Sequence, residues 1–247
     1  MKTLILGGTR EAREIAHIAS GERGFDIISS LAGRVRDPLL PEGPVRIGGF
    51  GGGEGLRKWL VDNEIAGVID ATHPFAGTIS ANAAGAAADL GLPILHVRRT
   101  GWSEQPGDRW IRVPDLDAAV QEVAQLGERV FLTIGRQGVA AFAGLTRQWF
   151  LIRAIDPPTG ALPPHHELLL ARGPFSPADE QRLMARHGID VLVTKDSGGD
   201  QTAAKLDAAR SAGLPVVVVD RPELPPGAVV VETVDAAWTW LRAIASR

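Results

Sequence analysis

Short runs of apolar residues alternate along this chain with segments in which apolar residues recur at helical spacing. The runs fall at residues 3–6, 26–30, 45–47, 68–70, 94–97, 110–113, 130–133, 149–153, 167–171, 191–194 and 215–219. Strands this short and apolar are buried on both faces, and strands that alternate with helices form parallel sheets. The pattern therefore predicts an α/β fold with largely parallel sheets.

The segments between these runs predict the helices. They fall at residues 10–19, 53–63, 75–90, 116–126, 177–187, 202–212 and 234–245. Residues 75–90 are rich in alanine, which favours helix. Ser176 followed by Pro177 supplies an N-cap and a proline in the first turn. Residues 156–166 contain four prolines and are predicted to form a loop.

A polar stretch rich in turn formers, residues 98–109, interrupts this alternation. We read it as a connector between an N-terminal Rossmann-like domain at residues 1–100 and a C-terminal α/β domain at residues 101–247. The expected fold is thus two Rossmann-like domains with a cleft between them. Ligands of such sheets bind beyond the carboxyl ends of the strands, so the loops that follow strands are the candidate sites.

Composition excludes several kinds of chemistry. The chain has no Cys and no Tyr, which excludes disulfides, thiolate metal sites, cysteine nucleophiles and a catalytic Tyr-Lys pair. A net charge of −3 gives no reason to expect nucleic-acid binding. The first apolar run ends at Gly7 and is too short for a signal peptide or membrane span, so we expect a cytoplasmic protein without a membrane partner.

Arginine dominates the basic residues. Only four of the 26 lysine and arginine residues are lysine, so the other 22 are arginine. A GC-rich genome explains this simply. The functional alternative is that planar guanidinium groups suit carboxylate and phosphate ligands.

Three glycine- or arginine-bearing turns lie in the N-terminal half. The first, GGTREA at residues 7–12, joins a strand to a helix and allows an anion to approach the helix start, although it lacks the full G-x-G-x-x-G pattern. The second places Arg34 and Arg36, and no acidic residue, after the second strand, which favours a phosphate or carboxylate partner. The third has six glycines in residues 48–55 and allows close backbone approach. The alternative for the first is a plain turn, for the second a pair of solvated arginines, and for the third a flexible surface loop.

Polar residues also follow three further strands. The string DATHPFA at residues 70–76 places Thr72 and His73 at a strand end, although a lone His is often structural. Residues 133–138 resemble a small anion-binding turn, and residues 194–199 combine a lysine, hydroxyls and two glycines. Either turn could merely end its strand. His165 and His166 are expected to point to opposite faces of a strand, so no metal site is predicted.

Taken together, these strings resemble the ordered motif set of the precorrin-6A reductase family. The resemblance rests on GGTREA, SLAGR at residues 30–34, GGFGG at 48–52, DATHPFA, TKDSGG at 194–199 and the closing stretch from Lys205 through Pro222. It spans nearly the whole chain, and DATHPFA is its most specific piece. The resemblance implies two α/β domains and an NADPH-dependent reduction of precorrin-6A to precorrin-6B in cobalamin biosynthesis.

We assign candidate roles on this basis. His73 and Asp196 are the candidate catalytic residues, as proton relays. The candidate NADPH-binding residues are Gly7, Gly8, Thr9, Arg10, Glu11, Thr72, Thr133, Gly135, Arg136, Lys195, Ser197, Gly198 and Gly199. The candidate substrate-binding residues are Arg34, Arg36, Arg98, Arg153 and Lys205.

Other readings stay open at this point. One alternative is a cobalt-containing substrate, as in the anaerobic branch of the pathway. A glycosyltransferase with two Rossmann-like halves would share the glycine loops, although 247 residues is short for it. A dinucleotide-binding regulatory module is the non-enzymatic alternative. The expected assembly is a monomer or a homodimer.

Overall fold

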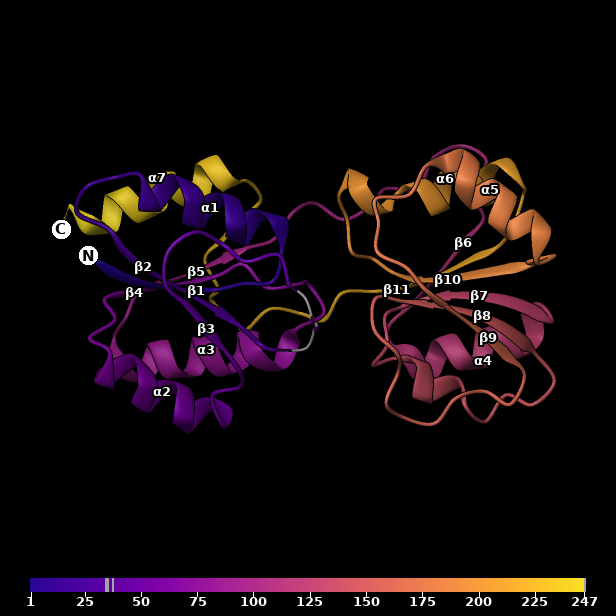
Figure 1. The fold of residues 1–247 in the computed structure, drawn as a ribbon, viewed down its shortest axis with the longest axis horizontal. Coiled ribbons are helices and arrows are strands. Elements are labelled where there is room, and N and C mark those ends of the chain that lie inside the picture. The colour runs from indigo at the N-terminus through magenta and orange to yellow at the C-terminus, as the bar shows by residue number, and fades with distance from the viewer. Residues whose placement is uncertain (34–35, 37, 247) are drawn as a thin grey trace. The chain divides into compact units, whose positions relative to one another are not determined.

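The chain forms two compact α/β units, which the computed structural model describes for residues 1–33, 36 and 38–246 (Figure 1). Unit 1 comprises Met1–Thr100 and Pro222–Arg247, and unit 2 comprises Gly101–Arg221. Each contains one six-stranded sheet in which every pair of neighbouring strands is parallel. The predicted fold class is confirmed, while the cleft stays a prediction.

Unit 1 is a doubly wound sheet with helices on both faces. Its strands are β1 (Lys2–Leu6), β2 (Asp26–Leu31), β3 (Val45–Ile47), β4 (Gly67–Asp70), β5 (Ile94–Val97) and β12 (Val230–Val231). Its helices are α1 (Arg10–Ser20), α2 (Gly52–Asp62), α3 (Gly77–Leu90) and α7 (Val234–Ala245). The strand order is β12-β5-β4-β1-β2-β3, so the chain reverses direction across the sheet between β1 and β4.

Each face of the unit 1 sheet is closed by one pair of helices. Helices α1 and α7 lie on one side of the sheet and α2 and α3 on the other (Figure 1). Alternate residues of a strand point to opposite faces. Ile5 accordingly joins the core beneath α1 and α7, whereas Leu4 and Leu6 join the core beneath α2 and α3.

Unit 2 repeats the same plan. Its strands are β6 (Trp110–Val113), β7 (Arg129–Thr133), β8 (Trp149–Ala154), β9 (His166–Leu170), β10 (Val191–Lys195) and β11 (Val216–Val219). Its helices are α4 (Leu116–Leu126), α5 (Pro177–Arg186) and α6 (Ala204–Ser211), with short 3₁₀ turns η1 (Val139–Phe142) and η2 (Asp200–Thr202). The order β6-β11-β10-β7-β8-β9 places its reversal between β7 and β10.

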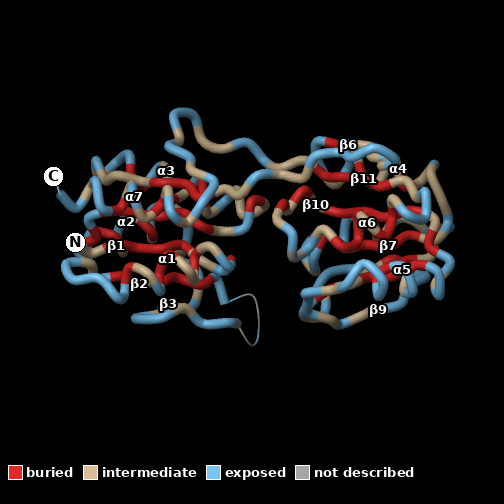
Figure 2. The backbone as a smooth tube through the Cα atoms, turned by 90° about the horizontal axis from the view of Figure 1, so that it is seen from above, coloured by how far each residue is buried: buried red, intermediate tan, exposed pale blue. Residues whose placement is uncertain are grey.

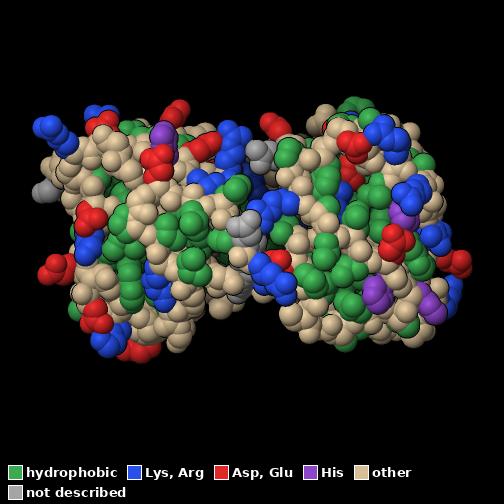
Figure 3. Space-filling view, viewed as in Figure 1, with side chains coloured by type: hydrophobic (Ala, Val, Ile, Leu, Met, Phe, Trp, Pro, Cys, Tyr) green, Lys and Arg blue, Asp and Glu red, His purple; other side chains and the backbone are tan. Residues whose placement is uncertain are grey.

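Burial explains why the strands follow the apolar runs so closely. The inner strands form the buried centre of each unit, and the exposed segments are mainly loops and outer helix faces (Figure 2). All four residues of β11 and of β4 are buried. On the surface seen in Figure 3, side chains of both charge signs are interspersed on each unit, in keeping with the small net charge.

The C-terminal segment corrects the predicted domain division. The boundary at residue 100 agrees with the structure, but Pro222–Arg247 belongs to unit 1 and not to residues 101–221. Strand β12 pairs with β5 in parallel, with Val230 opposite His96, and α7 packs on α1. A strand of two residues carries no detectable periodicity, and the apolar face of α7 does not reveal which sheet it will cover.

We predict that Leu241→Ala in α7 destabilises unit 1. Leu241 is fully buried, and truncation of such a leucine typically costs about 2–5 kcal/mol. Hydrogen–deuterium exchange should accelerate in α1, β5 and β12 and stay unchanged in β7, β8 and β10. Val61→Ala in α2, where the side chain is 53% exposed, is the control and should cost little. Equal acceleration in both units would contradict the division.

Candidate functional site

The turns after β1 and β4 meet at the reversal point of unit 1. The N–H of Gly7 donates to the Ser30 carbonyl at 2.9 Å, and Gly8 has a φ of +111°, which favours glycine. Thr9 caps α1 by accepting from the Ala12 N–H at 3.2 Å, and its hydroxyl donates to the Ala71 carbonyl at 2.6 Å. One side chain therefore ties the glycine turn to the turn that follows β4.

A buried polar network supports the turn after β4. The Asp70 side chain accepts from the Thr72 N–H at 3.1 Å and from the Thr72 hydroxyl at 2.7 Å, and its second oxygen lies 2.9 Å from Nδ1 of His96. Burial would raise the pKa of Asp70, but hydrogen bonds from His96, Ser80 and Thr72 outweigh it and keep that pKa below its ordinary value. The carboxylate is thus held ionised, and it fixes the conformation of residues 70–72.

His73 lies at the solvent side of the same turn. It is exposed, its Nδ1 accepts from the Phe75 N–H at 3.2 Å, and its carbonyl accepts from the Ala76 N–H at 2.7 Å. The first bond restrains the ring and the second restrains the backbone, and the residue remains exposed, as a proton donor to a ligand requires.

Arg10 and Glu11, two predicted NADPH-binding residues at the start of α1, differ in their burial. Arg10 is exposed and pairs with Glu14, whereas Glu11 is half-buried and pairs with Arg99 at 3.1 Å. Burial would raise the pKa of Glu11, but hydrogen bonding and the Arg99 charge lower it. Glu11 therefore contributes a negative charge to the first turn of α1, held in place by an arginine 88 residues away.

The three predicted substrate arginines of unit 1 also differ. Arg36 is exposed. Arg98 donates to the Pro222 carbonyl at 3.1 Å, and burial lowers its pKa. Arg34 lies outside the described residues.

The glycine-rich turn at residues 48–55 is held by Arg46. Its guanidinium donates to the carbonyls of Gly48 and Gly49 at 2.5 and 2.6 Å.

The turns after β7 and β10 meet at the reversal point of unit 2. The Thr133 hydroxyl donates to the Val193 carbonyl at 3.0 Å, so the two strand ends are joined. Gly135, Gly198 and Gly199 have φ values of +76°, +65° and +75°, conformations that other residues rarely adopt. Lys195 is half-buried, and burial lowers its pKa. Arg136 and Ser197 are also half-buried.

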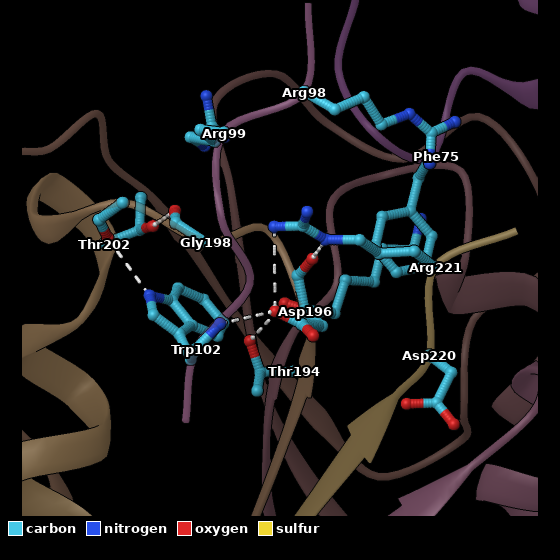
Figure 4. A network of polar contacts seen from close by, with 12 residues as sticks. Phe75, Arg98, Arg99, Trp102, Thr194, Asp196, Gly198, Thr202, Asp220 and Arg221 are labelled. Carbon is cyan, nitrogen blue, oxygen red and sulfur yellow. Dashed lines mark hydrogen bonds and ion pairs between the residues drawn. The ribbon is translucent and has the colours of Figure 1, made fainter. Parts of the chain in front are cut away.

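Asp196 anchors the segment that leads into unit 2 (Figure 4). Its carboxylate is buried, accepts from the Trp102 N–H at 3.0 Å and pairs with Arg112 at 2.9 Å. Nε of Arg221 donates to its carbonyl at 2.7 Å. The Trp102 indole donates in turn to the Gly199 carbonyl at 3.0 Å. Through these contacts Asp196 links Trp102, Arg112 and Arg221 to the turn at residues 196–199, and its catalytic role stays a prediction.

Arg153 and Lys205, which lie 52 residues apart in the sequence, line one cavity of about 210 Å³ in unit 2. Thr133, Gly135, Phe175 and Glu180 also line this cavity. Arg153 pairs with Glu180 at 2.8 Å, and both side chains are at least nine-tenths buried. Sequence reasoning missed Glu180, Arg99, Trp102 and His96, although a histidine inside an apolar strand run was a visible signal in the last case.

Two further properties concern only the part of the chain that the structure describes. No group of three or more His, Cys, Asp or Glu side chains is arranged to hold a metal ion there. None of the helices there combines the length and apolarity needed to cross a bilayer.

Two doubly wound α/β units with glycine turns and polar side chains at both reversal points are typical of α/β enzymes whose ligands bind beyond the carboxyl ends of the strands. A family profile described as "Precorrin-6x reductase CbiJ/CobK" matches residues 2–242. The chain belongs to this family of oxidoreductases, as the resemblance of its motifs predicted.

Individual relatives agree with this family. The chain is 55% identical over 246 residues to the precorrin-6A reductase of Rhodococcus erythropolis, with 100% of this chain and 99% of that protein covered. It is 25% identical to a cobalt-precorrin-6A reductase of Priestia megaterium, with 92% of each covered. A solved structure titled "CobK precorrin-6A reductase" superposes with a TM-score of 0.90 and 42% identity, covering 99% of this chain and 97% of that one.

We predict that Asp70→Asn destabilises the protein at pH 7 by about 1–3 kcal/mol, the usual cost of breaking a buried hydrogen-bond network. Because the pKa of Asp70 is lowered in the folded state, its contribution is present above the unfolded-state pKa of about 4 and is lost as pH falls below it. Urea unfolding should therefore show a difference from wild type at pH 7 that shrinks at pH 3. Asp62→Asn, in an exposed pair with Lys58, is the control. A difference independent of pH would contradict the assigned charge.

Proposed function

We propose that this protein reduces precorrin-6A to precorrin-6B with NADPH. The observation that carries the proposal is the reversal point of unit 1, where the GGT turn and the DATH turn are tied together by the bond from Thr9 to Ala71. Membership of the family and the similarity to relatives named for this activity support the choice of substrate.

The residues at the reversal points fit a dinucleotide. Gly8 has a left-handed conformation and open space where a side chain would stand, and α1 begins two residues later with its N–H groups directed toward the turn. Gly7, Gly8, Thr9, Arg10, Glu11 and Thr72 are the candidate NADPH-binding residues of unit 1. Those of unit 2 are Thr133, Gly135, Arg136, Lys195, Ser197, Gly198 and Gly199.

NADPH supplies the hydride when it is bound, and the protein binds, orients and excludes water. The reduced macrocycle must also gain a proton. His73 is the candidate donor, because it is exposed shortly after the end of β4 and the Phe75 N–H binds its Nδ1, which leaves Nε2 as the ring nitrogen that carries hydrogen. Asp196 was a second candidate, and its three contacts favour a role in holding residues 196–199 in place.

Precorrins carry several carboxylates, so their binding requires cations. Arg36 and Arg98 in unit 1, with Arg34, and Arg153 and Lys205 in unit 2 are the candidates. We favour the metal-free substrate over its cobalt-containing analogue, because the relative named for the cobalt substrate is much less similar. We expect the protein to act in the cytoplasm as a monomer or homodimer.

The proposal is tested by following absorbance at 340 nm with purified precorrin-6A and either NADPH or NADH. We expect oxidation of NADPH that depends on the macrocycle, and slower oxidation of NADH. Absence of macrocycle-dependent oxidation would exclude the reductase. Binding of NADPH without turnover would then favour the alternative of a dinucleotide-binding regulatory module.

We predict that His73→Ala lowers kcat roughly 10²- to 10⁴-fold, the usual contribution of a general acid, and leaves the Kd of NADPH within about twofold. The matched control is Thr78→Ala, at an exposed position of α3. A kcat within about threefold of wild type would remove His73 from the scheme. In the wild type, kcat should fall at high pH as the donor loses its proton, and this fall should be absent in His73→Ala.

A further inference from the structure

The cavity at the carboxyl ends of β7, β8 and β9 contains more positive than negative charge. Its charged lining residues are Arg153 from β8, Glu180 from α5 and Lys205 from α6. A volume of about 210 Å³ is far more than the roughly 10–15 Å³ that a single water requires. The cavity is therefore large enough for a functional group of an organic ligand.

The arginine in this cavity has donors to spare. Arg153 is 9% exposed in its side chain, pairs with one oxygen of Glu180 at 2.8 Å and stacks on Phe175 at 3.8 Å. A guanidinium carries five N–H donors in a fixed fork, and only one is used by this ion pair. Stacking on Phe175 holds the fork in one orientation, which reduces the entropy lost when a ligand binds.

The lysine is buried without a carboxylate partner of its own. Lys205 is 6% exposed, its ammonium donates to the Thr202 carbonyl at 2.7 Å, and it lies 4.9 Å from the centroid of the Trp102 ring. Across the described residues, no carboxylate oxygen lies within 4.0 Å of its Nζ atom. Two of its three N–H donors are thus available to a ligand.

Glu180 leaves one further polar atom of the cavity unpaired among the described residues. Its side chain is 2% exposed, and Oε2 has no hydrogen-bond partner within the described part of the protein. A buried carboxylate oxygen left unpaired is costly unless a donor reaches it. The cavity therefore contains N–H donors of Arg153 and Lys205 beyond those used by Glu180 and Thr202, and one acceptor oxygen of Glu180 without a partner in the described chain.

We propose that this cavity is an oxyanion site, in which one carboxylate or phosphate group of a ligand binds between Arg153 and Lys205. The inference rests on the proposed function for the identity of the ligand, which is the macrocycle or NADPH. With Lys205 protonated, the three charged side chains sum to one positive charge. A singly charged carboxylate neutralises the site, whereas a phosphate dianion leaves it negative, so the charge balance favours the macrocycle.

Binding at this site is coupled to protonation of Lys205. Burial, with a smaller contribution from Arg153 and an opposing one from Glu180, lowers the pKa of Lys205 to about 7. An anion beside the amine favours its charged form and raises this pKa. Below pH 7 the lysine is already charged and affinity is constant. Above pH 7 binding must take up a proton, so affinity falls by up to about tenfold for each pH unit.

The first experiment measures binding of three ligands to the full chain by calorimetry at pH 6.5 and pH 8.5. The ligands are NADPH, NADH and a porphyrin octacarboxylate as a stable stand-in for the macrocycle. Repeating the titrations in buffers of different ionisation enthalpy gives the number of protons taken up. We expect uptake at pH 8.5 and almost none at pH 6.5 for the ligand that occupies the cavity.

Three variants make the test specific to Lys205. Lys205→Met should weaken that ligand roughly tenfold or more at pH 6.5 and abolish its proton uptake. Lys205→Arg should restore affinity but not proton uptake, because arginine remains charged. Lys58→Met, at an exposed position of α2, is the control. Lys205→Met is expected to fold, because removing a buried ammonium relieves a desolvation cost, and its melting temperature at pH 6.5 should equal or exceed that of the wild type.

The outcomes separate the sources of the oxyanion. Weaker binding of the porphyrin alone assigns the site to a carboxylate, and weaker binding of NADPH but not NADH assigns it to the 2′-phosphate. Unchanged affinity and proton uptake in Lys205→Met for all three ligands would overturn the inference, even if the wild type reduces precorrin-6A.

Inorganic phosphate provides a readout that does not depend on the proposed function. Because the Trp102 ring lies beside Lys205, phosphate should change tryptophan fluorescence saturably in the wild type and not in Lys205→Met. If the wild type binds neither NADPH nor the porphyrin but responds to phosphate in this way, the proposed function fails and the oxyanion site stands. An identical phosphate response in both proteins would contradict the site.

Discussion

The uniform direction of the strands is the constraint on which the rest of this structure depends. Because all strands of a sheet are parallel, their carboxyl ends lie at one edge, and every following turn begins there. Each sheet also reverses its winding once, between β1 and β4 in unit 1 and between β7 and β10 in unit 2. At these points neighbouring strands send their connections to opposite sides, which leaves backbone N–H groups and polar side chains accessible to a ligand.

Buried polar groups lie beneath this edge in both units, but they are arranged for different tasks. In unit 1, Asp70 receives hydrogen bonds from His96 and Thr72, so its charge is compensated and the turn before His73 is held rigid. In unit 2, Arg153 and Lys205 outnumber Glu180 and keep unused donors. Burying unpaired charge opposes folding, so stability does not explain this arrangement. An anionic ligand that binds the unused donors of Arg153 and Lys205 explains the arrangement.

Much of the fold was predictable because buried parallel strands appear as continuous apolar runs. All strands except β12 were predicted within one or two residues, and the bounds of α4 and α7 were predicted correctly. The membership of α7 in unit 1 was not, because an amphipathic helix does not encode its partner. The turns that carry candidate residues were predictable for the same reason as the strands. Their partners were not, since Arg99–Glu11 spans 88 residues and Asp70–His96 spans 26.

The most direct test of this account is hydrogen–deuterium exchange of the full chain with and without NADPH. The account predicts that NADPH slows exchange in one of two pairs of turns. The pair in unit 1 lies at residues 7–12 and 70–76, and the pair in unit 2 lies at residues 133–138 and 195–199. Each pair follows the strands at a reversal point. The loops before the strands, at residues 21–25, 91–93, 187–190 and 213–215, should be unaffected. Protection confined to those loops would contradict the claim that ligands bind at the carboxyl edge of a sheet.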